Sequence, residues 1–135
     1  RRILSANLGI GSRLPAHVVS LGRVLLAALP PEKLNYFLEN ATLQKLTPRT
    51  VVEPDKLTAE LQRVRDQGYA WVDGELDPAI CGIAVPVRDQ RGAVVAAISI
   101  NTISGSIDEE GAKQRFLTAL RRTAQNIQSQ TIAAA

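Results

Sequence analysis

Residues 69–101 read YAWVDGELDPAICGIAVPVRDQRGAVVAAISIN, and this stretch decides the fold. Three segments in it, residues 69–73, 80–89 and 93–101, either alternate apolar with polar residues or are rich in Val and Ile, as β-strands are. The tetrapeptide DQRG at residues 89–92 lies between the second and third segments and is typical of a hairpin turn. The stretch therefore predicts an antiparallel hairpin with a neighbouring strand.

Helical patterns surround this stretch on both sides. Apolar residues recur at helical spacing over residues 16–29, over a shorter segment at residues 31–39, and over the amphipathic residues 54–67, which Gly68 ends. After the last strand, residues 108–132 form one long amphipathic pattern that opens with three acidic residues, as a positive helix N-terminus favours. We therefore expect three helices before the strands and one after them.

An apolar-rich segment at residues 3–10, followed by Gly11, predicts one further strand at the start of the chain. The resulting order is one strand, three helices, three or more strands and a helix. This order favours an antiparallel sheet covered by helices over a doubly wound parallel sheet. We predict an α+β fold within the broad α/β class.

The composition is that of one ordinary globular domain. The chain has 135 residues, and Lys and Arg outnumber Asp and Glu by 16 to 13, which gives a formal net charge of +3. Because the basic residues are dispersed, they make a poor footprint for nucleic acid. No apolar run is long enough to span a membrane and no signal peptide is present, so we expect a cytoplasmic protein. Since the first residue is Arg1 rather than Met, we interpret the chain as a fragment.

The chain offers little for catalysis or metal binding. Cys81 is the single cysteine and His17 the single histidine, so a metal site is improbable and we expect neither a metal nor a cofactor. No Gly-x-Ser-x-Gly motif is present, and GIGSR at residues 9–13 lacks the dinucleotide fingerprint and the lysine of a P-loop. We expect that the chain is not an enzyme. A small enzyme and a ligand-free dimerisation module stay open as alternatives.

Several polar residues are candidates for a binding site. Ser99 and Asn101 alternate with isoleucines, so their side chains share one face of a strand that is either wet or lines a cavity. His17 is equally consistent with a ligand contact and with a hydrogen bond to the backbone. Asp73 directly follows an apolar strand end and is a candidate, whereas Glu75 is expected in solvent.

Three segments, residues 1–30, 46–101 and 120–127, resemble successive blocks of the C-terminal domain of the IclR family of bacterial transcription regulators. The resemblance covers nearly the whole chain. Its first block, with the run RRILSANLGIGSRLPAH, is similar to the PcaR-like and PobR-like regulators, which control the breakdown of aromatic acids through protocatechuate and the β-ketoadipate pathway.

The resemblance implies a GAF-like sensor domain that forms a homodimer or homotetramer and binds a small organic acid, such as protocatechuate, 4-hydroxybenzoate or β-ketoadipate. Residues 1–135 are then one effector-binding domain, truncated at its N-terminus because the family's domain usually begins before RRILSAN. The full protein would contact DNA only through an N-terminal winged helix-turn-helix, which is absent from this chain.

The resemblance also places the effector pocket. Carried over position by position, it falls on Leu14, Pro15, Ala16, His17, Ser20, Asp73, Gly82, Ser99 and Asn101. Ile83 is expected to line its apolar part together with Leu14 and Ala16, and Arg13 is either a partner for a carboxylate or an exposed arginine. Two positions depart from the family: Gly82 stands where many members have a cysteine, and Val72 stands where some have a second acidic residue. Cys81 stands where an arginine is common, so its role stays open.

Overall fold

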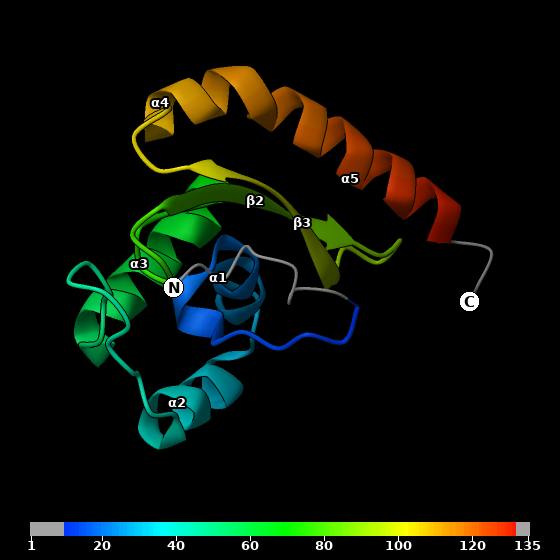
Figure 1. Ribbon diagram of the computed structural model, residues 1–135. Coiled ribbons are helices and arrows are strands. Elements are labelled where there is room, and N and C mark those ends of the chain that lie inside the picture. The colour runs from blue at the N-terminus through cyan, green and yellow to red at the C-terminus, as the bar shows by residue number, and fades with distance from the viewer. Residues whose placement is uncertain (1–9, 132–135) are drawn as a thin grey trace.

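The computed structural model describes residues 10–131 and contains a three-stranded antiparallel sheet in the order β1–β2–β3 (Figure 1). The strands are β1 (Ala70–Asp73), β2 (Ile80–Arg88) and β3 (Val94–Ile103), each close to its predicted range. β2 pairs antiparallel with β3 across the turn at residues 89–92, where the Asp89 N–H donates to the Ala93 carbonyl at 2.8 Å. The predicted hairpin and neighbouring strand are confirmed.

Helices cover both faces of this sheet (Figure 1). On one side lie α1 (Ser20–Ala27), α2 (Pro31–Asn40) and α3 (Pro54–Gln67). On the other side α4 (Glu109–Ala112) and α5 (Thr118–Thr131) run across the strands. The predicted α+β class, an antiparallel sheet covered by helices, is confirmed.

Side-chain alternation along the strands divides the hydrophobic core into two clusters. Ala70 and Ala84 face α1 and α3 and pack in a cluster with Leu57 and Leu61, with Ala97 of β3 at its edge. The larger apolar side chains of the strands pack instead in a cluster with α5: Tyr69, Ile83, Val85 and Val87, with Trp71, Ile98 and Ile100 partly buried beside them. Small residues therefore face α1, and this is the side of the sheet where space for a ligand arises.

The first helical segment differs from its prediction. Residues 16–18 form a 3₁₀ turn, Val19 is extended with φ −127° and ψ 148°, and α1 begins only at Ser20. The break lets the chain fold back on itself, because Gly22 lies against the Ala16 backbone so closely that a side chain there would collide with it. The strand predicted over residues 3–10 lies outside the described residues, except for an exposed Ile10 in a turn.

The last helical segment begins at Asp108, whose carboxylate caps the helix by accepting a hydrogen bond from the Gly111 N–H at 2.8 Å. The helix predicted over residues 108–132 is present as α4, a π-helical turn at Lys113–Leu117 and α5. Its apolar face covers the sheet. Within residues 10–131, no helix has both the length and the apolar character needed to cross a membrane.

Candidate functional site

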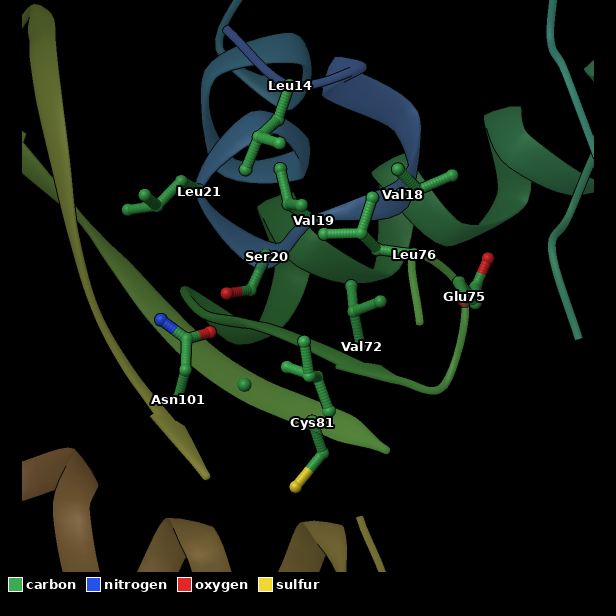
Figure 2. A pocket seen from close by; sticks show the side chains of 12 residues that line it. Leu14, Val18, Val19, Ser20, Leu21, Val72, Glu75, Leu76, Cys81 and Asn101 are labelled. Atoms are coloured by element: carbon green, nitrogen blue, oxygen red, sulfur yellow. The ribbon is translucent and has the colours of Figure 1, made fainter. Parts of the chain in front are cut away.

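A cavity of about 80 Å³ lies between the start of α1, the strands and the loop that joins β1 to β2 (Figure 2). Its described lining is mostly apolar and consists of Leu14, Val18, Val19, Ser20, Leu21, Val72, Glu75, Leu76, Ile80, Cys81, Gly82 and Asn101. We call this cavity the effector pocket, after the pocket that the resemblance to the IclR family implies.

Ser20 and Asn101 form one polar end of the effector pocket (Figure 2). They come together because Asn101 of β3 pairs directly with Gly82 of β2, and Gly82 has no side chain to separate them. A Cβ atom at residue 82 would overlap the Asn101 Oδ1 and lie 3.2 Å from the Ser20 Oγ. Asn101 also donates from Nδ2 to the Ser99 Oγ at 3.1 Å, which fixes its amide. Gly82 therefore makes room for this polar end.

The start of α1 lies at the same end, since Val19, Ser20 and Leu21 are among the lining residues. The Val19 side chain makes no capping hydrogen bond, and the helix's first bond of the α type runs from the Arg23 N–H to the Val19 carbonyl at 3.1 Å. The N–H groups of residues 20–22 come before that bond and, as in any helix, have no carbonyl partner within it. Such groups, together with the helix dipole, attract a carboxylate.

Glu75 forms the other polar end of the pocket (Figure 2). Its side chain was expected in solvent, and that expectation is wrong, since Glu75 is 8% exposed. The physical reason is Arg23, a fully buried arginine of α1 that donates from Nη2 to the Glu75 Oε1 at 2.6 Å. Each charge makes burial of the other possible, and the Val51 N–H donates to the same oxygen at 2.9 Å.

Four of the residues predicted from the sequence lie together in the effector pocket: Leu14, Ser20, Gly82 and Asn101. Ser99 lies beside the pocket, partly exposed, and contacts it through its bond to Asn101. Pro15 and Ala16 precede α1 and do not line the pocket, and Ala16 instead packs against the core. Arg13 is exposed on the surface.

The sequence left His17 either as a ligand contact or as a hydrogen-bond partner of the backbone, and the structure shows a backbone hydrogen bond. The His17 side chain is 3% exposed, and Nε2 lies 3.1 Å from the Gln44 carbonyl oxygen, with which it forms a hydrogen bond. Its own carbonyl accepts from the Arg23 Nε at 3.0 Å. His17 therefore joins the loop after α2 to the turn before α1, and it is not among the residues that line the pocket.

Asp73, Ile83 and the Cys81 thiol lie on the sheet face away from the pocket. Asp73 accepts a hydrogen bond from the Ser104 Oγ at 2.6 Å and forms an ion pair with Arg49 at 3.3 Å. Ile83 is fully buried in the cluster with α5, because strand alternation turns it away from its neighbour Gly82. The Cys81 sulfur points away from the pocket (Figure 2), and burial, with the Asp73 carboxylate second, raises the pKa of this thiol. A protonated, buried thiol is inert.

Sequence reasoning missed most of the apolar lining. Val18, Val19 and Leu21 come from the turn into α1, and Leu76 comes from the β1–β2 loop. Val72 was noticed only as a departure from the family, although its alternation with buried Ala70 indicated an inward side chain. Val72 lies at the pocket because it pairs with Gly82, and the sequence alone does not specify the register of that pairing.

The rest of the described chain offers a less suitable ligand site than the effector pocket, and no metal site. An open groove of about 590 Å³ lies at the far end of α1, against the hairpin, but its lining is largely apolar, with Arg65 and Arg88 as its charged side chains. The Arg65 Nε already donates to the Ala27 carbonyl at 2.7 Å, and an Arg88 nitrogen donates to the Gly92 carbonyl at 2.8 Å. Among residues 10–131, no group of three or more His, Cys, Asp or Glu side chains is placed to hold a metal ion.

Comparison with known proteins agrees with this fold. Residues 1–129 match the family model described as bacterial transcriptional regulator IclR, C-terminal. A transcriptional regulator from Rhodococcus sp. RHA1 has a crystal structure that superposes with a TM-score of 0.88 at 38% identity, covering 96% of this chain and 52% of that one. The chain therefore belongs to the IclR C-terminal family.

The chain is also similar to two regulators of the family whose names refer to the Pca regulon and to PobR. The Pca regulon regulatory protein of Pseudomonas putida is 42% identical over 119 residues, covering 88% of this chain and 41% of that protein. The inducer-binding domain of a PobR double mutant from Acinetobacter, solved with 3-hydroxybenzoic acid, has a TM-score of 0.83 at 31% identity and covers 89% of this chain and 69% of that one. The chain spans less than half the length of the curated relatives it matches.

Proposed function

We propose that this chain is the effector-binding domain of a bacterial transcription regulator and that its effector is a small aromatic acid, which it binds without turning it over. The observation that carries the proposal is the effector pocket. It combines an apolar wall with Ser20, Asn101 and the first N–H groups of α1 at one end. A carboxylate needs such donors, and a ring needs such a wall.

The ligand's carboxylate is assigned to the end where Ser20 and Asn101 meet. Ser20 is 3% exposed, and its hydroxyl has no hydrogen-bond partner among the described residues. Every fully buried polar side-chain atom in this part of the chain has a partner, so an unpartnered hydroxyl must be accessible at its surface. Since Ser20 lines the pocket, the pocket is where a ligand can reach this hydroxyl. Leu14 and Val72 contact the apolar part of the ligand. Of the residues predicted from sequence, Leu14, Ser20, Gly82 and Asn101 are thus proposed as ligand contacts.

The relatives support an aromatic acid. One of them is a PobR inducer-binding domain in complex with 3-hydroxybenzoic acid. Another, 30% identical over 128 residues, is the p-hydroxybenzoate hydroxylase transcriptional activator of Acinetobacter baylyi. Since these relatives are regulators rather than enzymes, and since the His17 ring is hydrogen-bonded to the Gln44 carbonyl, binding without chemistry is the better interpretation.

The rest of the regulator would lie outside this chain. We propose that residues 1–135 join a separate winged helix-turn-helix and assemble as a homodimer or homotetramer. An effector that binds one arrangement of the sensor better than another then shifts the spacing of the DNA-reading helices. By itself the chain should not bind operator DNA, and a specific gel shift that survives ~150 mM salt would contradict this.

Thermal unfolding in the presence of protocatechuate, 4-hydroxybenzoate or β-ketoadipate tests the proposal. Protocatechuate or 4-hydroxybenzoate should raise the Tm, and chromatography should recover the compound unchanged at a stoichiometric amount. Consumption of the compound would show an enzyme. A shift with β-ketoadipate alone would contradict an aromatic effector, and no shift with any of the three compounds would support a ligand-free dimerisation module instead.

A further inference from the structure

Glu75 is the one charged side chain among the described residues that line the effector pocket, and half of its carboxylate is already engaged. The Oε1 atom accepts from the Arg23 Nη2 at 2.6 Å and from the Val51 N–H at 2.9 Å. The Oε2 atom accepts no hydrogen bond from a described residue. Every fully buried side-chain oxygen in this part of the chain has a hydrogen-bond partner, so the unpartnered Oε2 must be accessible at its surface. Glu75 is also one of the residues that line the pocket.

The two polar ends of the pocket differ in chemistry. Ser20 and Asn101 lie at one end and Glu75 lies at the other, with Val19 and Val72 between them (Figure 2). At the first end the Ser20 hydroxyl and the N–H groups at the start of α1 can donate hydrogen bonds, while the Asn101 Nδ2 is bonded to the Ser99 Oγ. An ionised carboxylate at the other end only accepts them. A ligand that fills the pocket must therefore bring an acceptor to one end and a donor to the other.

We propose that Glu75 is a specificity-determining residue, and that the effector is an organic acid with a hydroxyl group distant from its carboxylate. That hydroxyl donates to the Glu75 Oε2 while the carboxylate lies at the start of α1. The inference rests on the proposed function and adds to it the class of ligand. Arg23 and Val51 hold the Glu75 side chain in place, so the acceptor is fixed before the ligand arrives.

The same geometry disfavours a dicarboxylate. A second carboxylate beside Glu75 would place acceptor against acceptor and negative charge against negative charge. The nearest cation, Arg23, is fully buried and already bonded to Glu75 and to the His17 carbonyl at 3.0 Å. No lysine or arginine is among the described residues that line the pocket, so nothing there offsets the repulsion.

Calorimetric titration of the full chain with matched ligands tests the inference. The pairs are 3-hydroxybenzoate against 3-fluorobenzoate and 4-hydroxybenzoate against 4-fluorobenzoate, because fluorine resembles the hydroxyl in size but cannot donate. Benzoate and the dicarboxylate terephthalate complete the set. One hydroxybenzoate should bind about tenfold or more tighter than its fluorine partner and than terephthalate, as expected for a hydrogen bond to a charged group.

Two variants assign the effect to Glu75. In Glu75→Gln the amide oxygen can keep the bonds to Arg23 and Val51 while an NH₂ group replaces Oε2, so the preference for hydroxybenzoate over terephthalate should fall about tenfold. Glu60→Gln is the matched control, since Glu60 also lies beside Arg23, at 4.0 Å from Nη1, but does not line the pocket. It should leave the preference unchanged.

The outcomes separate the two proposals. Equal affinity for hydroxy and fluoro compounds, or tightest binding of terephthalate, would overturn the role of Glu75 and leave the aromatic-acid effector standing. If no compound in the set binds, both proposals fail. An equal change of preference in Glu75→Gln and Glu60→Gln would also overturn the inference. Should Glu75→Gln not fold, the matched pairs on the unaltered chain decide the question alone.

Discussion

Replacing Gly82 by alanine tests the effector pocket directly, because it adds one methyl group where α1, β2 and β3 meet. The added carbon overlaps the Asn101 Oδ1 and lies 3.2 Å from the Ser20 Oγ. The backbone accepts alanine, since Gly82 is not among the glycines with positive φ. Asn101 is exposed, so its side chain can give up the bond to Ser99 and turn away, and the cost falls on the pocket rather than on the core.

The size of the effect follows from overpacking. Forcing extra atoms into a packed site costs about 1 to 3 kcal/mol, which corresponds to roughly a five- to 150-fold weaker Kd when the ligand must share that space. Stability should change by less than about 1 kcal/mol, because alanine loses less conformational entropy in a strand than glycine does. Binding and stability should therefore separate in this variant.

Titration calorimetry with an effector and urea unfolding measure the two quantities. Gly105→Ala is the control: its φ of +88° strains alanine, but no atom lies within 4 Å of the new side chain. It should lose roughly 1 kcal/mol of stability and keep the parent's Kd. If Gly82→Ala binds the effector as tightly as the parent does, the ligand lies elsewhere and the pocket assignment is refuted.

Two further predictions concern the surroundings of the pocket, and a third concerns Tyr69 in the cluster with α5. Arg23→Met leaves a buried carboxylate without its cation and should lower the free energy of unfolding by about 3–5 kcal/mol, measured by urea denaturation. The double variant Ser99→Ala with Asn101→Ala should weaken effector binding by ~1 kcal/mol or more while the circular dichroism spectrum is kept; unchanged affinity would contradict the polar end. Burial, followed by the hydrogen bond to Glu109 at 2.7 Å, raises the pKa of Tyr69 from 10.0 to about 12. The stability from this phenol is therefore present below pH 10 and is lost as pH rises through about 12. Tyr69→Phe should lose this high-pH component of unfolding, and an identical pH profile would contradict the assignment.

The elements that carried their own start and stop signals were predictable from the sequence. The helix expected over residues 54–67 is present as α3 with the same bounds, because Pro54 can occupy the first turn and Gly68 ends the helix with φ +79°. The strands followed from alternation and from the turn at residues 89–92. The break at Val19 was not predictable, since the apolar pattern continues through it and only the packing of Gly22 on Ala16 requires it.

The pocket was predictable only in part, because it is assembled by register rather than by any one segment. Val72, Gly82 and Asn101 lie side by side across three strands, and each pairing fixes a position that no single strand specifies. Strand alternation indicated Asn101, and the resemblance to the family placed both Ser20 and Asn101 in the pocket. The resemblance could not supply Glu75, whose burial depends on Arg23, an arginine that its own helix pattern places on the apolar face.

A network of buried hydrogen bonds connects Glu75, and through it the pocket, to neighbouring segments of the domain. Arg23 joins α1 to the Glu75 side chain, the Thr50 hydroxyl donates to the Glu75 carbonyl at 2.7 Å, and residues 47–51 are thereby bonded to the loop at residues 74–79. One set of buried bonds thus connects three segments, of which α1 and the loop at residues 74–79 line the pocket. A ligand that contacts both the start of α1 and Glu75 bears on all three, and it can shift their arrangement by no more than its difference in affinity for the two states. Weak binding with a large difference would therefore serve a sensor better than tight binding that is equal in both states, because only the difference moves the equilibrium.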